Sequence, residues 1–135
     1  MNPNNAPRIS ILLPTYNGDI NKMLKAIESL RNQSYTDFEC IIVDDSDDNL
    51  VIDFLNGISV SDKRFKYFRG NGKGIAAALN FGLSLSKGDF IARSDDTDIS
   101  HLNRLELQLN FLIKNSDIGV VGSNIEVKRN GRKIT

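Results

Sequence analysis

Short apolar runs alternate with segments of helical periodicity along most of this sequence. Ile9–Leu13 and Phe38–Val43 have the length and composition of buried strands, and weaker runs occupy Phe65–Phe68 and Phe90–Ala92. Strands that alternate with helices through short connections are typical of an α/β domain. The pattern therefore predicts a Rossmann-like, mostly parallel sheet flanked by helices on both faces.

Apolar residues at spacings of three and four predict the helices between these strands. Such stripes begin at Ile20, with Asp19 as a candidate N-cap, and at Ile75, in a helix expected to end at Lys87-Gly88. Ser100 is expected to cap a third helix, and a short apolar patch suggests another at 51–55. Pro14 is expected to end the first strand, since proline cannot donate to a ladder. Two further strands are predicted, at Ile118–Val121 and Ile125–Val127.

Composition excludes several classes of protein. The 17 basic and 17 acidic residues cancel, so the clustered basic excess of a nucleic-acid-binding protein is missing. No apolar run approaches the roughly 20 residues of a membrane helix, and the first eight residues lack the pattern of a signal peptide. The single cysteine, Cys40, fits a reducing compartment. We expect a cytoplasmic domain that spans residues 1–135 and reaches a membrane only through other segments.

Acidic residues follow two of the predicted strands. The pair Asp44-Asp45 comes after the second strand, and the segment Asp95–Asp98 comes soon after Phe90–Ala92. Ligands of α/β sheets bind outside the carboxyl ends of the strands, where these acids should converge. Carboxylates packed closely repel one another unless a cation intervenes, and Mg²⁺ or Mn²⁺ is the natural oxygen-bound cation. Solvated turns are the simpler interpretation of either cluster alone.

Two other segments could contribute to such a site. In the turn after the first strand, Pro14-Thr15-Tyr16-Asn17, the tyrosine could stack on a base and the Thr15 hydroxyl could form hydrogen bonds. The glycine-rich loop 70–74 opens a helix, so its amides and Lys73 could face an anion. Neither segment fits a dinucleotide fingerprint or a P-loop.

Taken in order, these segments resemble the family 2 glycosyltransferases, whose fold is called GT-A. The resemblance covers Ile9 to about Glu126, and its order and spacing are specific. Its pieces are the run from Ser10 to Asn17, the Ile-Ile-Val-Asp-Asp-Ser segment at 41–46, Gly74–Gly82, Lys87–Arg93 with the acids that follow, and Val120–Ser123.

The resemblance implies transfer of a sugar from a nucleotide-diphosphate donor to an acceptor glycan or lipid-linked saccharide, as in polysaccharide biosynthesis, usually with inversion at the anomeric carbon. It implies that the donor site contains the turn residues Pro14, Thr15, Tyr16 and Asn17, the pair Asp44 and Asp45, the loop residues Asn71 and Lys73, and the acids Asp95 and Asp96. The Asp-x-Asp motif of the family binds the ribose and a divalent cation, Mn²⁺ or Mg²⁺.

The sequence departs from the family pattern in two respects. Thr97 occupies the usual position of the second motif acid, so Asp96 and Asp98 become the expected metal ligands. Family members also continue well past the position of Thr135, and their general base lies in that later part. We therefore expect this chain to supply a donor site but no catalytic base.

Two alternatives remain at the level of sequence. The chain could be a non-catalytic, nucleotide-sugar-binding relative, because of Thr97 and the missing base. It could also be a receiver-like signalling domain, in which an acid pair after a buried strand binds magnesium. Against the second, the acid pair follows the second strand rather than the first, and no lysine ends the Val120-Val121 run.

Overall fold

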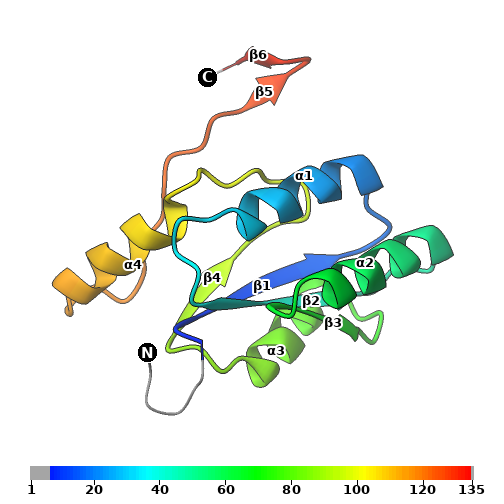
Figure 1. The fold of residues 1–135 in the computed structure, drawn as a ribbon, viewed down its shortest axis with the longest axis horizontal. Coiled ribbons are helices and arrows are strands. Elements are labelled where there is room, and N and C mark those ends of the chain that lie inside the picture. Colours follow the sequence, from blue (N-terminus) through cyan, green and yellow to red (C-terminus); the bar gives the residue numbers. More distant parts are fainter. Residues whose placement is uncertain (1–6, 135) are drawn as a thin grey trace.

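The computed structural model describes residues 7–134, so the first six residues, part of the stretch without a signal-peptide pattern, lie outside it. Its centre is a four-stranded parallel sheet in the order β3-β2-β1-β4 (Figure 1). The strands are β1 (Ile9–Thr15), β2 (Phe38–Asp44), β3 (Phe65–Arg69) and β4 (Phe90–Arg93). The helices are α1 (Ile20–Arg31), α2 (Asn49–Ser61), α3 (Ile75–Leu85) and α4 (Arg104–Lys114). The predicted α/β class with a parallel sheet is confirmed.

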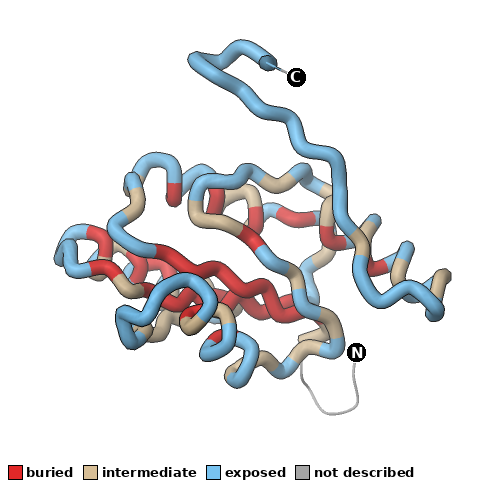
Figure 2. Tube along the Cα trace, turned by 180° about the vertical axis from the view of Figure 1, so that it is seen from behind, coloured by how far each residue is buried: buried red, intermediate tan, exposed pale blue. Residues whose placement is uncertain are grey.

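Alternating side chains of the two central strands face two different helical layers. Ile11 and Ile42 belong to the larger core cluster, which α1, α2 and α4 cover. Leu12 and Ile41 belong to a smaller cluster with Ala78 of α3 on the other face. All residues of β1 and β2 are buried, as Figure 2 shows for the centre of the molecule. The sheet is therefore covered on both faces, as the nearly continuous apolar runs of its strands indicate.

Three element boundaries differ from the prediction. Asp19 caps α1 as expected, accepting from the Lys22 N–H over 3.0 Å, but α4 begins only at Arg104. Asn103 rather than Ser100 occupies the N-cap position, and the Ser100 hydroxyl accepts from the Arg104 guanidinium over 3.1 Å. The third helix ends at Leu85 rather than Lys87-Gly88, and the 51–55 patch extends into the 13 residues of α2.

Pro14 lies inside β1 rather than ending it. Along β1, Leu12 accepts a hydrogen bond from Ser94 beyond β4, whereas Thr15 accepts one from Asp45 beyond β2. Backbone groups of alternate residues face alternate neighbouring strands, so Pro14, two residues after Leu12, faces the β4 side. The ladder between β1 and β4 ends at the Leu12–Arg93 pair, so the N–H that Pro14 lacks has no partner there. A proline at this position removes no ladder hydrogen bond, and β1 continues along β2 to Thr15.

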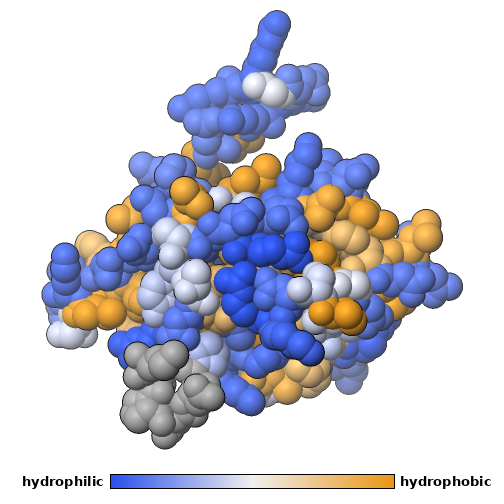
Figure 3. Space-filling model, in the orientation of Figure 1, coloured by the Kyte–Doolittle hydropathy of each residue, from blue (hydrophilic) through white to orange (hydrophobic). Residues whose placement is uncertain are grey.

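The C-terminal part also departs from the prediction. Neither Ile118–Val121 nor Ile125–Val127 forms a strand; instead β5 (Lys128–Arg129) and β6 (Arg132–Lys133) pair antiparallel. Asn130 and Gly131 have φ of 50° and 76°, the left-handed conformations that a two-residue hairpin turn requires. The hairpin stands apart from the body as a hydrophilic lobe (Figure 3), and Val120 is 86% exposed. Within residues 7–134 these two apolar runs pair with no neighbouring strand, so their composition alone does not make them strands.

In the part of the chain that the structure describes, no helix combines the length and the apolarity needed to cross a membrane.

Candidate functional site

A cavity of about 680 Å³ opens at the carboxyl ends of β1 and β4. The strand order places β4 directly beside β1, whereas β2 and β3 continue the sheet on the other side. Ligands of open α/β sheets bind at such a change of direction, outside the carboxyl ends of the strands. The cavity is lined by Pro14, Thr15, Tyr16, Asp45, Gly72, Gly74, Ile75, Ala78, Arg93, Asp95, Asp96 and Thr97.

The turn after β1 is hydrogen-bonded to the acidic segment after β4. The Thr15 hydroxyl donates to a carboxylate oxygen of Asp96 over 2.6 Å, although the two residues are 81 positions apart. Gly18 allows this approach, because a Cβ there would lie 2.7 Å from the same carboxylate oxygen. Thr15 itself is 7% exposed, so its position is fixed by the sheet. The result is a carboxylate held at the cavity wall by a rigid strand end.

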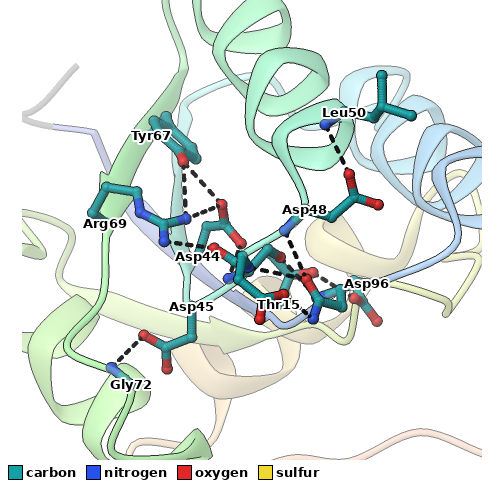
Figure 4. A network of polar contacts seen from close by, with 12 residues as sticks. Thr15, Asp44, Asp45, Asp48, Leu50, Tyr67, Arg69, Gly72 and Asp96 are labelled. Carbon is teal, nitrogen blue, oxygen red and sulfur yellow. Dashed lines mark hydrogen bonds and ion pairs between the residues drawn. The ribbon is translucent and has the colours of Figure 1, made fainter.

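Asp45 forms a second wall together with the glycine-rich loop. Its carboxylate accepts a hydrogen bond from the Gly72 N–H over 2.9 Å (Figure 4). A Cβ at Gly70 would lie only 2.0 Å from the same oxygen, so only glycine leaves room for Asp45 in this position. Gly72 and Gly74 have φ of 69° and 91°, which favours glycine at both positions. The loop before α3 is therefore shaped around the Asp45 carboxylate.

Asp44, the neighbour of Asp45, lies in a different environment. Its carboxylate is fully buried and accepts hydrogen bonds from the Tyr67 hydroxyl (2.8 Å), the Arg69 guanidinium (2.7 Å) and the Ser46 N–H (2.8 Å). Burial and the charge of Asp44 raise the pKa of the Tyr67 hydroxyl. The donor contact that the resemblance implies for Asp44 stays a prediction, and in this structure its carboxylate has no exposed surface and does not line the cavity. Asp44 instead holds the end of β2 against the end of β3.

Arg93 is a cation of this cavity that the sequence analysis did not single out. It ends β4, and its guanidinium lies 3.3 Å from the Asp95 carboxylate, which also lines the cavity. Alternation along β4 turns its side chain away from the larger core, toward the α3 side. Its position two residues before the acidic segment was the available clue. The cavity thus carries three carboxylates, of Asp45, Asp95 and Asp96, and one guanidinium.

Six of the predicted donor-site residues line the cavity: Pro14, Thr15, Tyr16, Asp45, Asp95 and Asp96. Tyr16 is 67% exposed, with its ring free to contact a ligand.

The remaining predicted residues do not line the cavity. Asn17 accepts from the Asp47 and Asp48 N–H groups, at 3.1 and 3.2 Å, and so links the β1 turn to the start of α2. The Asn71 side chain accepts from the Lys73 N–H within its own loop, and the Lys73 side chain is exposed. Asp98 is also exposed and its N–H closes a turn onto the Asp95 carbonyl, so only Asp96 of the two expected metal ligands faces the cavity.

The cavity suits a hard divalent cation only if the ligand shares the coordination. Within residues 7–134 no three His, Cys, Asp or Glu side chains gather into a metal site of their own. Asp95 and Asp96 offer carboxylate oxygens on one wall. Mg²⁺ is usually held by one or two carboxylates together with waters and substrate phosphates, rather than by an all-protein cage. The two carboxylates therefore fit a cation that binds together with a phosphate-bearing ligand.

Solved structures with the same fold include a mannosyltransferase and a protein crystallised with a nucleotide sugar. A mannosyltransferase from Pyrobaculum calidifontis, solved with GDP-Man and Mn²⁺, superposes with a TM-score of 0.71 at 18% identity, over 79% of this chain and 32% of that one. TarS of S. aureus (residues 1–349), solved with UDP-GlcNAc, gives a TM-score of 0.66 at 23% identity, over 81% and 32%. The expected GT-A fold is confirmed.

Sequence comparison agrees with the fold. An uncharacterized glycosyltransferase of Haemophilus influenzae is 40% identical over 112 residues, which are 82% of this chain and 44% of that protein. The chain thus spans less than half the length of this relative. The strand order of this chain, β3-β2-β1-β4, differs from the 2-1-3-4-5 order of receiver domains, so the receiver-like signalling alternative is wrong. The family model described as "Glycosyl transferase family 2" matches residues 10–135, and the chain belongs to that family.

Proposed function

We propose that this chain forms the donor site of a glycosyltransferase, binding a nucleotide-diphosphate sugar in the cavity between the ends of β1 and β4. The observation that carries the proposal is the Thr15–Asp96 hydrogen bond of 2.6 Å. It joins the turn that would contact the nucleoside to the acids that would hold the diphosphate. The two ends of one extended ligand thus meet a single continuous wall.

The nucleoside end of the ligand is assigned to Tyr16 and Asp45. Tyr16 offers an exposed aromatic face, and stacking on a base is tolerant of its identity. Asp45 keeps a second carboxylate oxygen beyond the one that accepts from Gly72, and that oxygen can accept from a base N–H or a ribose hydroxyl.

The diphosphate end is assigned to Asp95, Asp96 and Arg93. A divalent cation, Mn²⁺ or Mg²⁺, bound by these acids would neutralise the charge that develops on the departing diphosphate. Arg93 can exchange its 3.3 Å contact with Asp95 for a phosphate oxygen, because the guanidinium lies at the same wall. Thr15 keeps the Asp96 carboxylate oriented toward the cavity through its hydrogen bond.

The wider activity is proposed on the family alone. It comprises inverting transfer to the hydroxyl of an acceptor glycan or lipid-linked saccharide, in the cytoplasm or at the inner face of a membrane. None of the residues that line the cavity is assigned as the general base. A non-catalytic binding relative would share the same donor site, so donor binding is the first property to test.

Thermal unfolding in the presence of nucleotides tests the proposal. A ligand that binds only the native state stabilises it by about 2.7 kcal/mol at a hundredfold excess over its Kd. We expect UDP, GDP, CDP or dTDP to raise the Tm when Mn²⁺ or Mg²⁺ is present, and Asp45→Asn to abolish most of the rise. A Tm unchanged by all four nucleotides with either metal would contradict the proposed donor site.

A further inference from the structure

Arg104 is an arginine at an electrostatically unfavourable position. It is the first residue of α4, where the helix dipole disfavours a cation. Burial lowers the pKa of its guanidinium, and the charge of Asp98 opposes that effect. The guanidinium nonetheless stays cationic, because arginine is not deprotonated in proteins. A cation placed at a helix N-terminus against the helix dipole is expected to form contacts that offset this cost.

All three guanidinium nitrogens of Arg104 donate hydrogen bonds. Nη2 donates to the Arg93 carbonyl over 2.7 Å, Nη1 to the Ser100 hydroxyl over 3.1 Å, and Nε to the Gln108 side chain over 3.2 Å. Arg93 is the last residue of β4, and Ser100 follows the acidic segment. One planar group therefore bridges the two ends of the segment 94–99, which contains the cavity acids Asp95 and Asp96.

The far end of this bridge is anchored independently to α1. The Ser100 N–H donates to the Ser29 hydroxyl over 2.9 Å. The buried Gln33 side chain donates to the His101 carbonyl (2.7 Å) and accepts from the Leu105 N–H (3.0 Å). Arg104 thus connects two rigid supports, the sheet through β4 and the helical layer through α1, with the acidic segment between them.

Side chains of the sheet hold the middle of the segment at two points, the Thr15–Asp96 hydrogen bond of 2.6 Å and the exposed Arg93–Asp95 contact of 3.3 Å. Asp95 and Asp96 are adjacent carboxylates that repel each other, so a segment free at its ends would separate them or turn them toward solvent. We propose that Arg104 is a positioning residue, which closes the segment 94–99 so that Asp95 and Asp96 stay turned toward the cavity. The proposal rests on the proposed function, because the segment is assigned to the diphosphate and its cation.

Three variants and a matched control test whether Arg104 positions the segment 94–99 or only stabilises the fold as a whole. Arg104→Met removes all three hydrogen bonds, and Arg104→Lys keeps the charge and the stem but loses the planar fork. Ser100→Ala removes one bond and is the mildest change. Arg31→Met is the control, since Arg31 is also a half-buried arginine, stacked on Phe65 and 3.6 Å from Asp62, in contacts remote from the cavity.

The first measurement is amide hydrogen exchange without nucleotide. We expect faster exchange in residues 94–99 of Arg104→Met and Arg104→Lys, a smaller change in Ser100→Ala, and no change there in Arg31→Met. The glycine-rich loop 70–74, which Arg104 does not contact, should exchange as in the wild type. Unchanged exchange of 94–99 in both Arg104 variants would overturn the proposal, whether or not the protein binds nucleotides.

The second measurement is affinity for the nucleoside diphosphate that most stabilises the wild type, with Mn²⁺, against the matching monophosphate without metal. Loss of a residue that supports metal ligands typically costs about 10- to 100-fold. We expect a loss of about tenfold for the diphosphate with Mn²⁺ in Arg104→Met, and a change below about twofold for the monophosphate. Equal losses for both ligands would reduce Arg104 to a general structural residue. If no nucleotide binds the wild type, the donor site itself is refuted, while the exchange result still decides whether Arg104 holds the segment.

Discussion

Asp44 and Asp45 are adjacent in sequence, but Asp44 is fully buried against Arg69 whereas Asp45 lines the cavity beside Gly72. The alternation of side chains at the end of β2 separates them. Asp44 therefore joins two strand ends, and Asp45 faces the ligand. The two carboxylates should have different functions, which substitution can distinguish.

Asp44→Ala should lower the free energy of unfolding. It should have less effect on nucleotide affinity, when affinity is measured under conditions in which the variant is folded. It removes the acceptor of Tyr67, Arg69 and the Ser46 N–H at once. Losing one partner of a buried ion pair costs about 3 to 5 kcal/mol, and the half-exposed Arg69 can regain water, so we expect about 2 kcal/mol. Urea unfolding measures this change. Asp45→Ala should change the free energy of unfolding by less than about 1 kcal/mol and weaken nucleotide binding about tenfold.

Gly70→Ala and Gly18→Ala should each displace one cavity carboxylate. The new Cβ would lie 2.0 Å from an Asp45 oxygen in the first variant and 2.7 Å from an Asp96 oxygen in the second. Both carboxylates can rotate away, although a Cβ at Gly18 would also lie 3.0 Å from the Sδ atom of the buried Met23, so Gly18→Ala should cost more stability than Gly70→Ala while both lose nucleotide affinity. Titration calorimetry of the two variants checks this expectation.

Gly57→Ala is the matched control for these glycines. Nothing lies within 4 Å of a Cβ at this position in the interior of α2, so the change should stabilise the protein by about 0.5 to 1 kcal/mol. Its nucleotide affinity should equal that of the wild type. If all three glycine variants lost affinity alike, displacement of the carboxylates could not be the cause.

Asp96→Asn and Asp98→Asn test which acid compensates for Thr97. Asp96 faces the cavity and is oriented by Thr15, whereas Asp98 is exposed and outside the cavity. We expect Asp96→Asn to remove most of the Mn²⁺-dependent gain in nucleotide affinity, and Asp98→Asn to change it by less than about twofold. Binding measured with Mn²⁺ and with EDTA separates the two. The reverse order of effects would assign the cation to Asp98 instead.

Glu39 provides a pH-dependent contribution to stability at the opposite end of the sheet. Burial alone raises the pKa of Glu39, but hydrogen bonds from Lys66, Ser10 and the Lys87 N–H, with the charge of Lys66, lower the pKa below its ordinary value of 4.5. A carboxyl with a lowered folded pKa stabilises the protein fully above its unfolded pKa, and this stabilisation is lost as pH falls through the folded pKa. Glu39→Gln should therefore be less stable than the wild type at pH 7, with a difference that narrows below about pH 4.5. Urea unfolding from pH 7 to pH 3 measures it, and a constant difference would argue against the ion pair.

The sheet was predictable because its strands are buried on both faces and therefore form uninterrupted apolar runs, as at Ile41–Val43. The C-terminal strands were not, since Val120 and Ile125 also lie in short apolar runs but, within residues 7–134, pair with no other strand. At the site, parallel topology brought the β1 turn and the acidic segment together as expected. Which carboxylate of the Asp44-Asp45 pair faces the cavity depends on Tyr67 and Arg69, whose contacts are long-range and leave no pattern in sequence.

Titration of the wild-type protein with UDP, GDP, CDP and dTDP, each with Mn²⁺ and with EDTA, tests the donor site most directly. The site predicts saturable binding of at least one nucleoside diphosphate that is markedly tighter with Mn²⁺, and that Asp45→Asn and Asp96→Asn both weaken. Absence of binding by all four nucleotides, or binding that neither substitution affects, would contradict it.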